Sequence, residues 1–179
     1  DLKDFVSCDQ FTSLIKLDLS FNSLTSKLES INFGDMVNLE ILDLSNNFLE
    51  SLPINMASLN SLKELRIQNN ALLILPEEIG SINSLVILKA NDNAFQNIPT
   101  SIGDLINLEQ LNFANNELRT FPNSLCNIFP FNMDSNNPET GIFNIGNNNI
   151  CSDCCLENCI EDICILGNSD ETCSDLPSS

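Results

Sequence analysis

Apolar and polar positions repeat with a long period in the middle of the chain. Leucines recur every 23 residues, at Leu42, Leu65, Leu88 and Leu111. Asparagines keep the same period, at Asn47, Asn70, Asn93 and Asn116. Both fall in segments of the form L-x-x-L-x-L-x-x-N-x-L, with Ala90 and Phe113 at the third apolar position of the last two. Because side chains alternate in a strand, L-x-L predicts a short strand with one apolar face. A repeat of this length predicts a solenoid.

One such strand cannot bury its apolar face alone, so we expect successive turns to stack around a shared core. The predicted inward columns are Leu17, Leu42, Leu65, Leu88, Leu111, Phe143 and Leu19, Leu44, Ile67, Ala90, Phe113, Ile145. The asparagines follow the strands, where main-chain N–H and C=O groups would otherwise be buried without partners. An amide side chain supplies both donors and an acceptor. We therefore expect a structural column of asparagines.

A second pattern follows each strand. It consists of an apolar residue, a proline and then further apolar positions. It is found at Leu52-Pro53, Leu75-Pro76, Ile98-Pro99 and Phe121-Pro122. The fixed φ of proline suits the first position of a helix, so these segments predict helical or 3-10 pieces of one to two turns. Glu77 and Glu78 follow Pro76 and favour the positive end of such a piece.

These repeats resemble the leucine-rich repeat family. The resemblance implies an α/β solenoid with a parallel β-sheet on its concave face and short helical or 3-10 segments on its convex face. Six repeats span residues 14–150, between a partial N-terminal cap at 1–13 and a Cys-rich C-terminal cap and tail at 151–179. The run FVSCDQFTSLIKLDLS resembles the end of an N-terminal cap in plant-type extracellular members, whose cysteine pairs with an upstream one. A loop rich in turn-forming residues is expected at 129–141.

Cysteines gather at the C-terminal end of the chain. Those expected in disulfides are Cys8, Cys126, Cys151, Cys154, Cys155, Cys159, Cys164 and Cys173. A zinc site is the alternative for the C-x-x-C-C run, but the chain has no histidine and its acidic setting does not lower thiol pKa. Disulfides closing the open end of the core are favoured, and they predict an oxidising, extracellular location, secreted or at the cell surface.

The odd number of cysteines at that end leaves the partner of Cys8 open. Five gaps between strands put the two ends roughly 24 Å apart at about 4.8 Å per gap, whereas a disulfide needs Cα atoms about 6 Å apart. Cys8 is therefore expected to be free, to pair with an upstream segment, or to join the odd cysteine of another molecule. Self-association through Cys8 or the C-terminal cap follows from the last of these.

Charge and motif content limit the remaining functions. The net charge is −18, with seven basic residues, which argues against nucleic-acid partners. No apolar run approaches membrane-spanning length, so membrane insertion is not expected. The carboxylates are scattered, and neither a paired acid–base motif nor a phosphate-binding loop occurs. We expect no enzyme activity, no metal and no cofactor.

The family resemblance places partner binding on the concave face, at the outward strand positions. The candidate residues are Lys16, Asp18, Ile41, Asp43, Glu64, Arg66, Ile87, Lys89, Gln110 and Asn112. Arg66 and Lys89 are expected side by side, near exposed Ile41 and Ile87. The predicted function is recognition of a protein or peptide partner through this face. The alternative is a structural subunit of an extracellular or cell-surface assembly that uses lateral and end surfaces.

Overall fold

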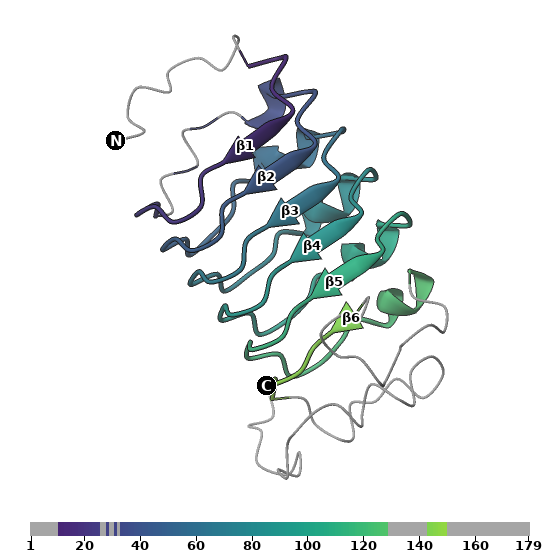
Figure 1. The fold of residues 1–179 in the computed structure, drawn as a ribbon. Helices are drawn as coiled ribbons and strands as arrows, with labels where there is room; N and C mark the ends of the chain where they lie inside the picture. The colour runs from purple at the N-terminus through teal and green to yellow at the C-terminus, as the bar shows by residue number, and fades with distance from the viewer. Residues whose placement is uncertain (1–10, 26–27, 29–30, 32, 129–142, 150–179) are drawn as a thin grey trace.

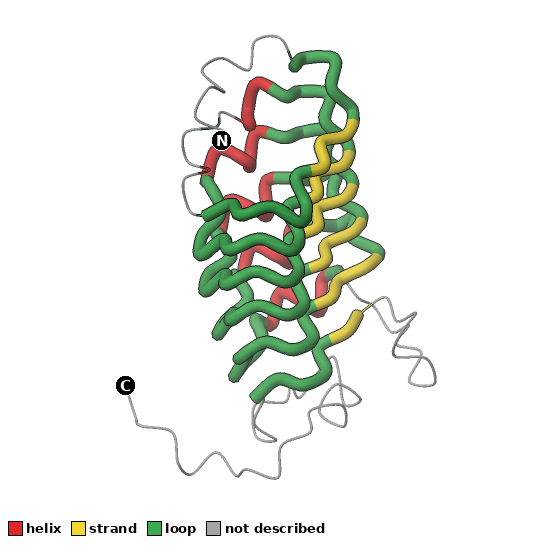
Figure 2. Tube along the Cα trace, turned by 60° about the vertical axis from the view of Figure 1, so that its left-hand side comes forward, coloured by secondary structure: helices red, strands yellow, loops and turns green. Residues whose placement is uncertain are grey.

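A computed structural model describes residues 11–25, 28, 31, 33–128 and 143–149, and shows them as a stack of similar turns (Figure 1). The described part contains one parallel sheet with strands in chain order. The strands are β1 (Lys16–Asp18), β2 (Ile41–Asp43), β3 (Glu64–Arg66), β4 (Ile87–Lys89), β5 (Gln110–Asn112) and β6 (Phe143–Asn144). Figure 2 shows them stacked in one column along one side of the solenoid. The α/β repeat architecture predicted from the 23-residue period is confirmed.

The register of the sheet confirms the first predicted core column. Leu17 pairs with Leu42, Leu42 with Leu65, Leu65 with Leu88, and the series continues through Leu111 to Phe143. From Leu42 onward the members of both columns are buried. Leu17 and Leu19 are only partly buried against the core, because β1 lies at the end of the sheet.

Short 3-10 segments form the other side of each turn. They are η4 (Phe33–Asp35), η5 (Ile54–Ser58), η6 (Glu77–Ser81), η7 (Thr100–Asp104) and η8 (Asn123–Asn127). The expectation that proline takes the first helical position is wrong by one residue. Pro53, with φ −71° and ψ 133°, is extended and caps η5 from outside, and Pro76, Pro99 and Pro122 do the same. The reason is visible at η5, where the Pro53 carbonyl accepts the first hydrogen bond of the turn, from the N–H of Met56 (3.1 Å).

The asparagine column satisfies main-chain groups in the manner predicted. Asn47 Nδ2 donates to the carbonyls of Leu19 and Leu44, both at 3.0 Å. Its Oδ1 accepts from the N–H of Leu24 at 3.0 Å, so one side chain joins two repeats. The same three-way bonding recurs at Asn70, Asn93, Asn116 and Asn148.

A second column stands directly before these asparagines and adopts the left-handed backbone conformation. Its members are Phe21, Asn46, Asn69, Asp92, Asn115 and Asn147, with φ between 52° and 57°. Asparagine and aspartate tolerate this conformation better than other side chains. Neighbours in the column also bond to one another, as where Asn115 Nδ2 donates to Asp92 Oδ1 at 2.8 Å. The sequence has a polar residue directly before each member of the asparagine column, but we did not predict that this residue takes the left-handed conformation.

Several predictions fall outside the described residues. They are the N-terminal cap up to residue 10, the loop at 129–141, and the C-terminal cap at 151–179. Of the cysteines, Cys126 lies in η8, and the others are outside the described ranges. The proposed disulfides and the partner of Cys8 therefore stay predictions.

Candidate functional site

The sheet face, defined by strand side chains that point away from the core, brings the ten candidate residues together. Register pairs the first row in the order Lys16, Ile41, Glu64, Ile87, Gln110. The second row runs Asp18, Asp43, Arg66, Lys89, Asn112. Arg66 and Lys89 are therefore lateral neighbours on β3 and β4, as the period predicted.

Where the strands end, acidic and amide side chains of the second row accept hydrogen bonds from nearby residues of the chain. Asp43 Oδ1 accepts from the N–H of Ser45 (3.0 Å) and from its Oγ (2.6 Å). Asp18 accepts from Ser20 in the same way, and these hydrogen bonds lower the pKa of Asp18. We did not predict this motif from the sequence, although Asp-Leu-Ser occurs at 18–20 and again at 43–45.

These bonds change the expected role of Asp43. The residue is only 5% exposed, so its carboxylate is not freely offered to a partner. The remaining oxygen, Oδ2, lies 3.3 Å from Arg66 Nη1. A buried carboxylate needs such partners, because desolvation of a bare charge is costly.

Arg66 is occupied on two sides. Its Nε donates to Glu64 Oε1 at 2.7 Å, and its Nη1 bonds Asp43 Oδ2. The hydrogen bond that Arg66 donates to Glu64, together with the negative charges of Glu64 and Asp43, raises the pKa of Arg66 above its ordinary value. The guanidinium thus links β2 and β3, and it is not the open cation that the sequence suggested.

Lys89 differs from its neighbour. It is half-buried on β4, and within the described residues it has no ion pair. No acid stands beside it in the row, since its lateral neighbours are Arg66 and Asn112. Of the neighbouring cations Arg66 and Lys89, Lys89 is therefore the one with a charge available to a partner.

The apolar side chains do not lie as expected. Ile41 and Ile87 are half-buried rather than exposed. Glu64 stands between them in the row, so they are not adjacent. The face offers two separate apolar spots and no continuous apolar patch.

The balance of charge on the sheet face is unlike that of the whole molecule. Its strand positions carry three basic residues, Lys16, Arg66 and Lys89, and three acidic residues, Asp18, Asp43 and Glu64. Their charges cancel. The third row, following the strands, is uncharged: Ser20, Ser45, Gln68, Asn91, Ala114 and Gly146. The chain as a whole has a net charge of −18. The described sheet face is thus electroneutral in a strongly acidic protein.

Other kinds of site were sought in the same part of the chain. Among the described residues, no group of three or more His, Cys, Asp or Glu is placed to hold a metal ion. No helix in the described ranges is long and apolar enough to cross a membrane.

Comparison with known proteins agrees with the geometry. The family model described as leucine-rich repeat region matches residues 1–128. A leucine-rich repeat protein of Leptospira interrogans superposes with a TM-score of 0.71 at 26% identity, over 82% of this chain and 34% of that one. No curated protein sequence matches significantly.

Two plant receptors also superpose. The plant peptide hormone receptor RGFR1, in complex with RGF2, gives a TM-score of 0.53 at 34% identity, over 63% of this chain and 22% of that one. The Arabidopsis receptor kinase HAESA, in complex with the peptide hormone IDA and the co-receptor SERK1, gives 0.57 at 27% identity, over 76% and 22%. The chain spans about a third or less of the length of these three structures. With the family model covering most of its length and the repeat geometry described above, the chain belongs to the leucine-rich repeat family.

Proposed function

We propose that the chain is an extracellular recognition module whose sheet face binds a protein or peptide partner. The observation that carries the proposal is the position of Lys89, which has no ion pair among the described residues, on an electroneutral face of an acidic molecule. A partner that carries a carboxylate can approach this face without the net repulsion that it would meet elsewhere on an acidic molecule. A charge in this position affects the orientation and the association rate of the partner more than its affinity.

The partner best suited to this face presents a carboxylate to Lys89 and apolar groups to Ile41 and Ile87. Arg66 contributes mainly by keeping Asp43 and Glu64 neutralised, since its own donors are engaged with them. The family and the peptide-bound plant receptors support a partner of protein or peptide class. The cluster of cysteines at 151–173 supports an extracellular location.

A cross-linking experiment tests the proposal. A photo-reactive amino acid at Gln110, exposed at the end of the first row, is expected to capture a partner from the extracellular material of the source. The same group at Asn123, exposed in η8 off the sheet, is the matched control. The proposal predicts capture from Gln110 only, and equal capture from both positions would contradict it.

The charge contribution is tested separately, with the captured partner. Lys89→Ala should slow association by about tenfold at low salt, and the difference should shrink as salt is added. Lys63→Ala removes the same charge one repeat away, where Lys63 is paired with Glu40 at 2.9 Å, and should change association little. Equal effects of the two variants would mean that only net charge matters.

The alternative of a structural assembly is separated from recognition by native mass. A soluble monomer favours recognition. A cross-linked polymer that dissolves on reduction would favour an assembly held through Cys8 or the C-terminal cap.

A further inference from the structure

Three exposed aliphatic side chains lie off the sheet face in adjacent repeats, one at the start of η5 and two on the stretch that leads into η6. Ile54 is 66% exposed, Leu73 51% and Ile74 72%. Polar residues take the equivalent places in neighbouring repeats. Ile54 corresponds to Glu77, Thr100 and Asn123, and the Leu73-Ile74 pair corresponds to Glu50-Ser51, Gln96-Asn97 and Arg119-Thr120. The apolar character is therefore local to the second and third repeats and is not required by the repeat.

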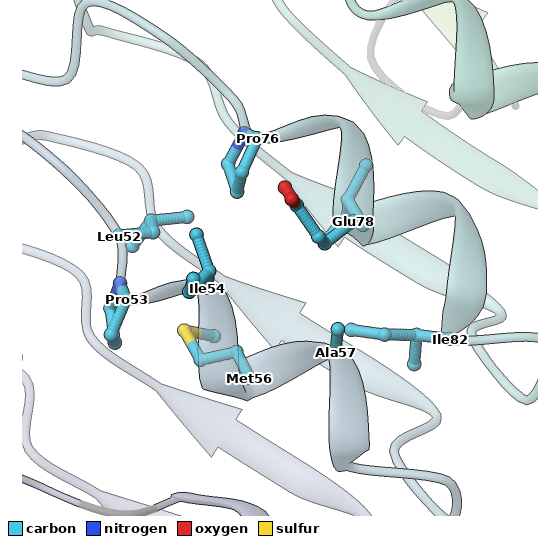
Figure 3. Close-up of a pocket in the computed structure, with 9 residues that line it drawn as sticks. Leu52, Pro53, Ile54, Met56, Ala57, Pro76, Glu78 and Ile82 are labelled. Carbon is cyan, nitrogen blue, oxygen red and sulfur yellow. The ribbon is translucent and has the colours of Figure 1, made fainter.

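A hollow lined in part by Ile54 lies between η5 and η6. Its lining residues are Leu52, Pro53, Ile54, Met56, Ala57, Pro76, Glu78, Ile79 and Ile82. It has a volume of about 10 Å³, room for one water-sized group such as a methyl. Figure 3 shows Ile54 and Met56 on one side, Pro76 on the other, and the Glu78 side chain directed toward Pro76. Leu73 and Ile74 lie on the stretch that runs directly into Pro76.

Single exposed apolar residues are normal on a protein surface and carry no meaning. This group differs, because Ile54 lines an apolar hollow, and Leu73 and Ile74 belong to the stretch that leads into Pro76 on the same hollow. Exposed apolar patches of this kind mark interaction sites. We name it the convex patch and define it as Ile54, Leu73, Ile74 and the hollow.

The charges around the convex patch select its occupant. Glu78 lines the hollow, and the main chain of Glu50 bonds that of Leu73, whose N–H donates to the Glu50 carbonyl at 3.5 Å. A second copy of this chain would bring the same carboxylates, together with a net charge of −18, against them. A basic partner meets them favourably.

We propose that the convex patch is a second docking surface, and that it binds a segment of a partner protein in which an aliphatic side chain is flanked by lysine or arginine. The aliphatic tip enters the hollow beside Met56 and Pro76. The flanking cations face Glu78 and Glu50. The surface is separate from the sheet face, so the chain can bridge two partners.

A pair of labelled peptides tests this inference by fluorescence anisotropy at low salt. In one peptide lysine alternates with isoleucine, and in the other glutamate replaces lysine. The lysine peptide should bind, and the Ile54→Ser/Ile74→Ser double variant should weaken binding by about tenfold or more, since each isoleucine contributes apolar contact. Ile106→Ser is the matched control, because Ile106 is 75% exposed in another repeat and its change also leaves the charge unaltered.

Selective loss in the double variant, with Ile106→Ser near wild type, supports the inference. Equal binding by all three proteins would mean general attraction to an acidic molecule, and would overturn it. Failure of the lysine peptide to bind, or equal binding of the glutamate peptide, would overturn it as well. So would a dimer in sedimentation velocity that the double variant abolishes, because a second copy would then be the occupant. Lys89→Ala should leave peptide binding unchanged, which separates this test from that of the sheet face.

Discussion

Phe21 holds, in the first repeat, the same left-handed turn that Asn46 holds in the second. Their φ angles are 52° and 55°. The N–H of Phe21 donates to the carbonyl of Ser45, in parallel with the N–H of Asn46, which donates to that of Gln68. Asparagine suits this conformation, whereas a bulky aromatic side chain is strained in it.

We therefore expect Phe21→Asn to stabilise the protein. Phe21 is 80% exposed, so little packing is lost, and relief of strain should raise the free energy of unfolding by about 0.5–1 kcal/mol. Urea unfolding measures the change. Phe48→Asn is the control, since Phe48 is 64% exposed without a positive φ, and it should stay within about 0.5 kcal/mol of wild type. Destabilisation by Phe21→Asn would show that the ring contributes contacts that outweigh the strain.

The asparagine column makes a second prediction. Asn70 Nδ2 donates to the carbonyls of Leu44 and Ile67, and its Oδ1 accepts from the N–H of Leu49. Asn70→Ala leaves these main-chain groups short of partners and should cost about 2–4 kcal/mol in urea unfolding. Asn60→Ala changes an exposed asparagine in the preceding repeat and should cost less than about 0.5 kcal/mol. Similar losses of stability from both substitutions would argue that the asparagine column does not stabilise the fold.

Much of this fold could be predicted because its signals are local and periodic. The spacing of Leu42, Leu65 and Leu88 sets the strands, the register and the buried columns together. The candidate face followed from the same alternation, which placed Arg66 beside Lys89. What could not be predicted was how the side chains pair there. Asp43, Glu64 and Arg66 neutralise one another across β2 and β3, and that pairing depends on rotamers, which a sequence pattern does not specify.

The convex patch was missed for a different reason. Leu73 and Ile74 read as further apolar residues of the repeat, although they fall where the other repeats are polar. Their exposure in the folded chain separates Leu73 and Ile74 from the core residues of the repeat. Glu77 was likewise assigned to the start of its own helical segment, whereas its carboxylate bonds the next one.

Close stacking of the 3-10 segments gives a third prediction. A Cβ on Gly80 would lie 2.5 Å from the carbonyl oxygen of Ser101 in the next turn, closer than atoms can approach. Gly80→Ala must push η6 and η7 apart and should cost about 1–3 kcal/mol in thermal or urea unfolding. Gly146→Ala is the matched control, since its Cβ would meet nothing closer than Asn144 Oδ1 at 3.4 Å. If Gly80→Ala lowered the stability no more than Gly146→Ala does, η6 and η7 would be able to move apart without a loss of stability.

The last prediction concerns pH and rests on Glu77. Its carboxylate accepts from the N–H of Ser101 (3.0 Å) and the N–H of Thr100 (3.2 Å), at the start of η7. These hydrogen bonds, that from Ser101 foremost, lower the pKa of Glu77 below its ordinary value of 4.5. A carboxyl whose pKa is lower in the folded state stabilises the protein above pH 4.5, and that stabilisation disappears as pH falls through the lowered pKa. Because the group is exposed, the amplitude should not exceed about 1 kcal/mol.

Glu77→Gln should therefore be less stable than wild type at neutral pH, and the gap should close as the solution is acidified below pH 4.5. Urea unfolding over a series of pH values measures the gap directly. Glu78→Gln removes a carboxylate from the same turn without touching the bonds to Thr100 and Ser101, so its profile should keep the wild-type step. A gap between wild type and Glu77→Gln that stayed constant from neutral to acid pH would show that the bonds to η7 do not depend on the charge of Glu77. The hydrogen bonds between η6 and η7 would then survive protonation of Glu77, beside the packing of Gly80 against Ser101.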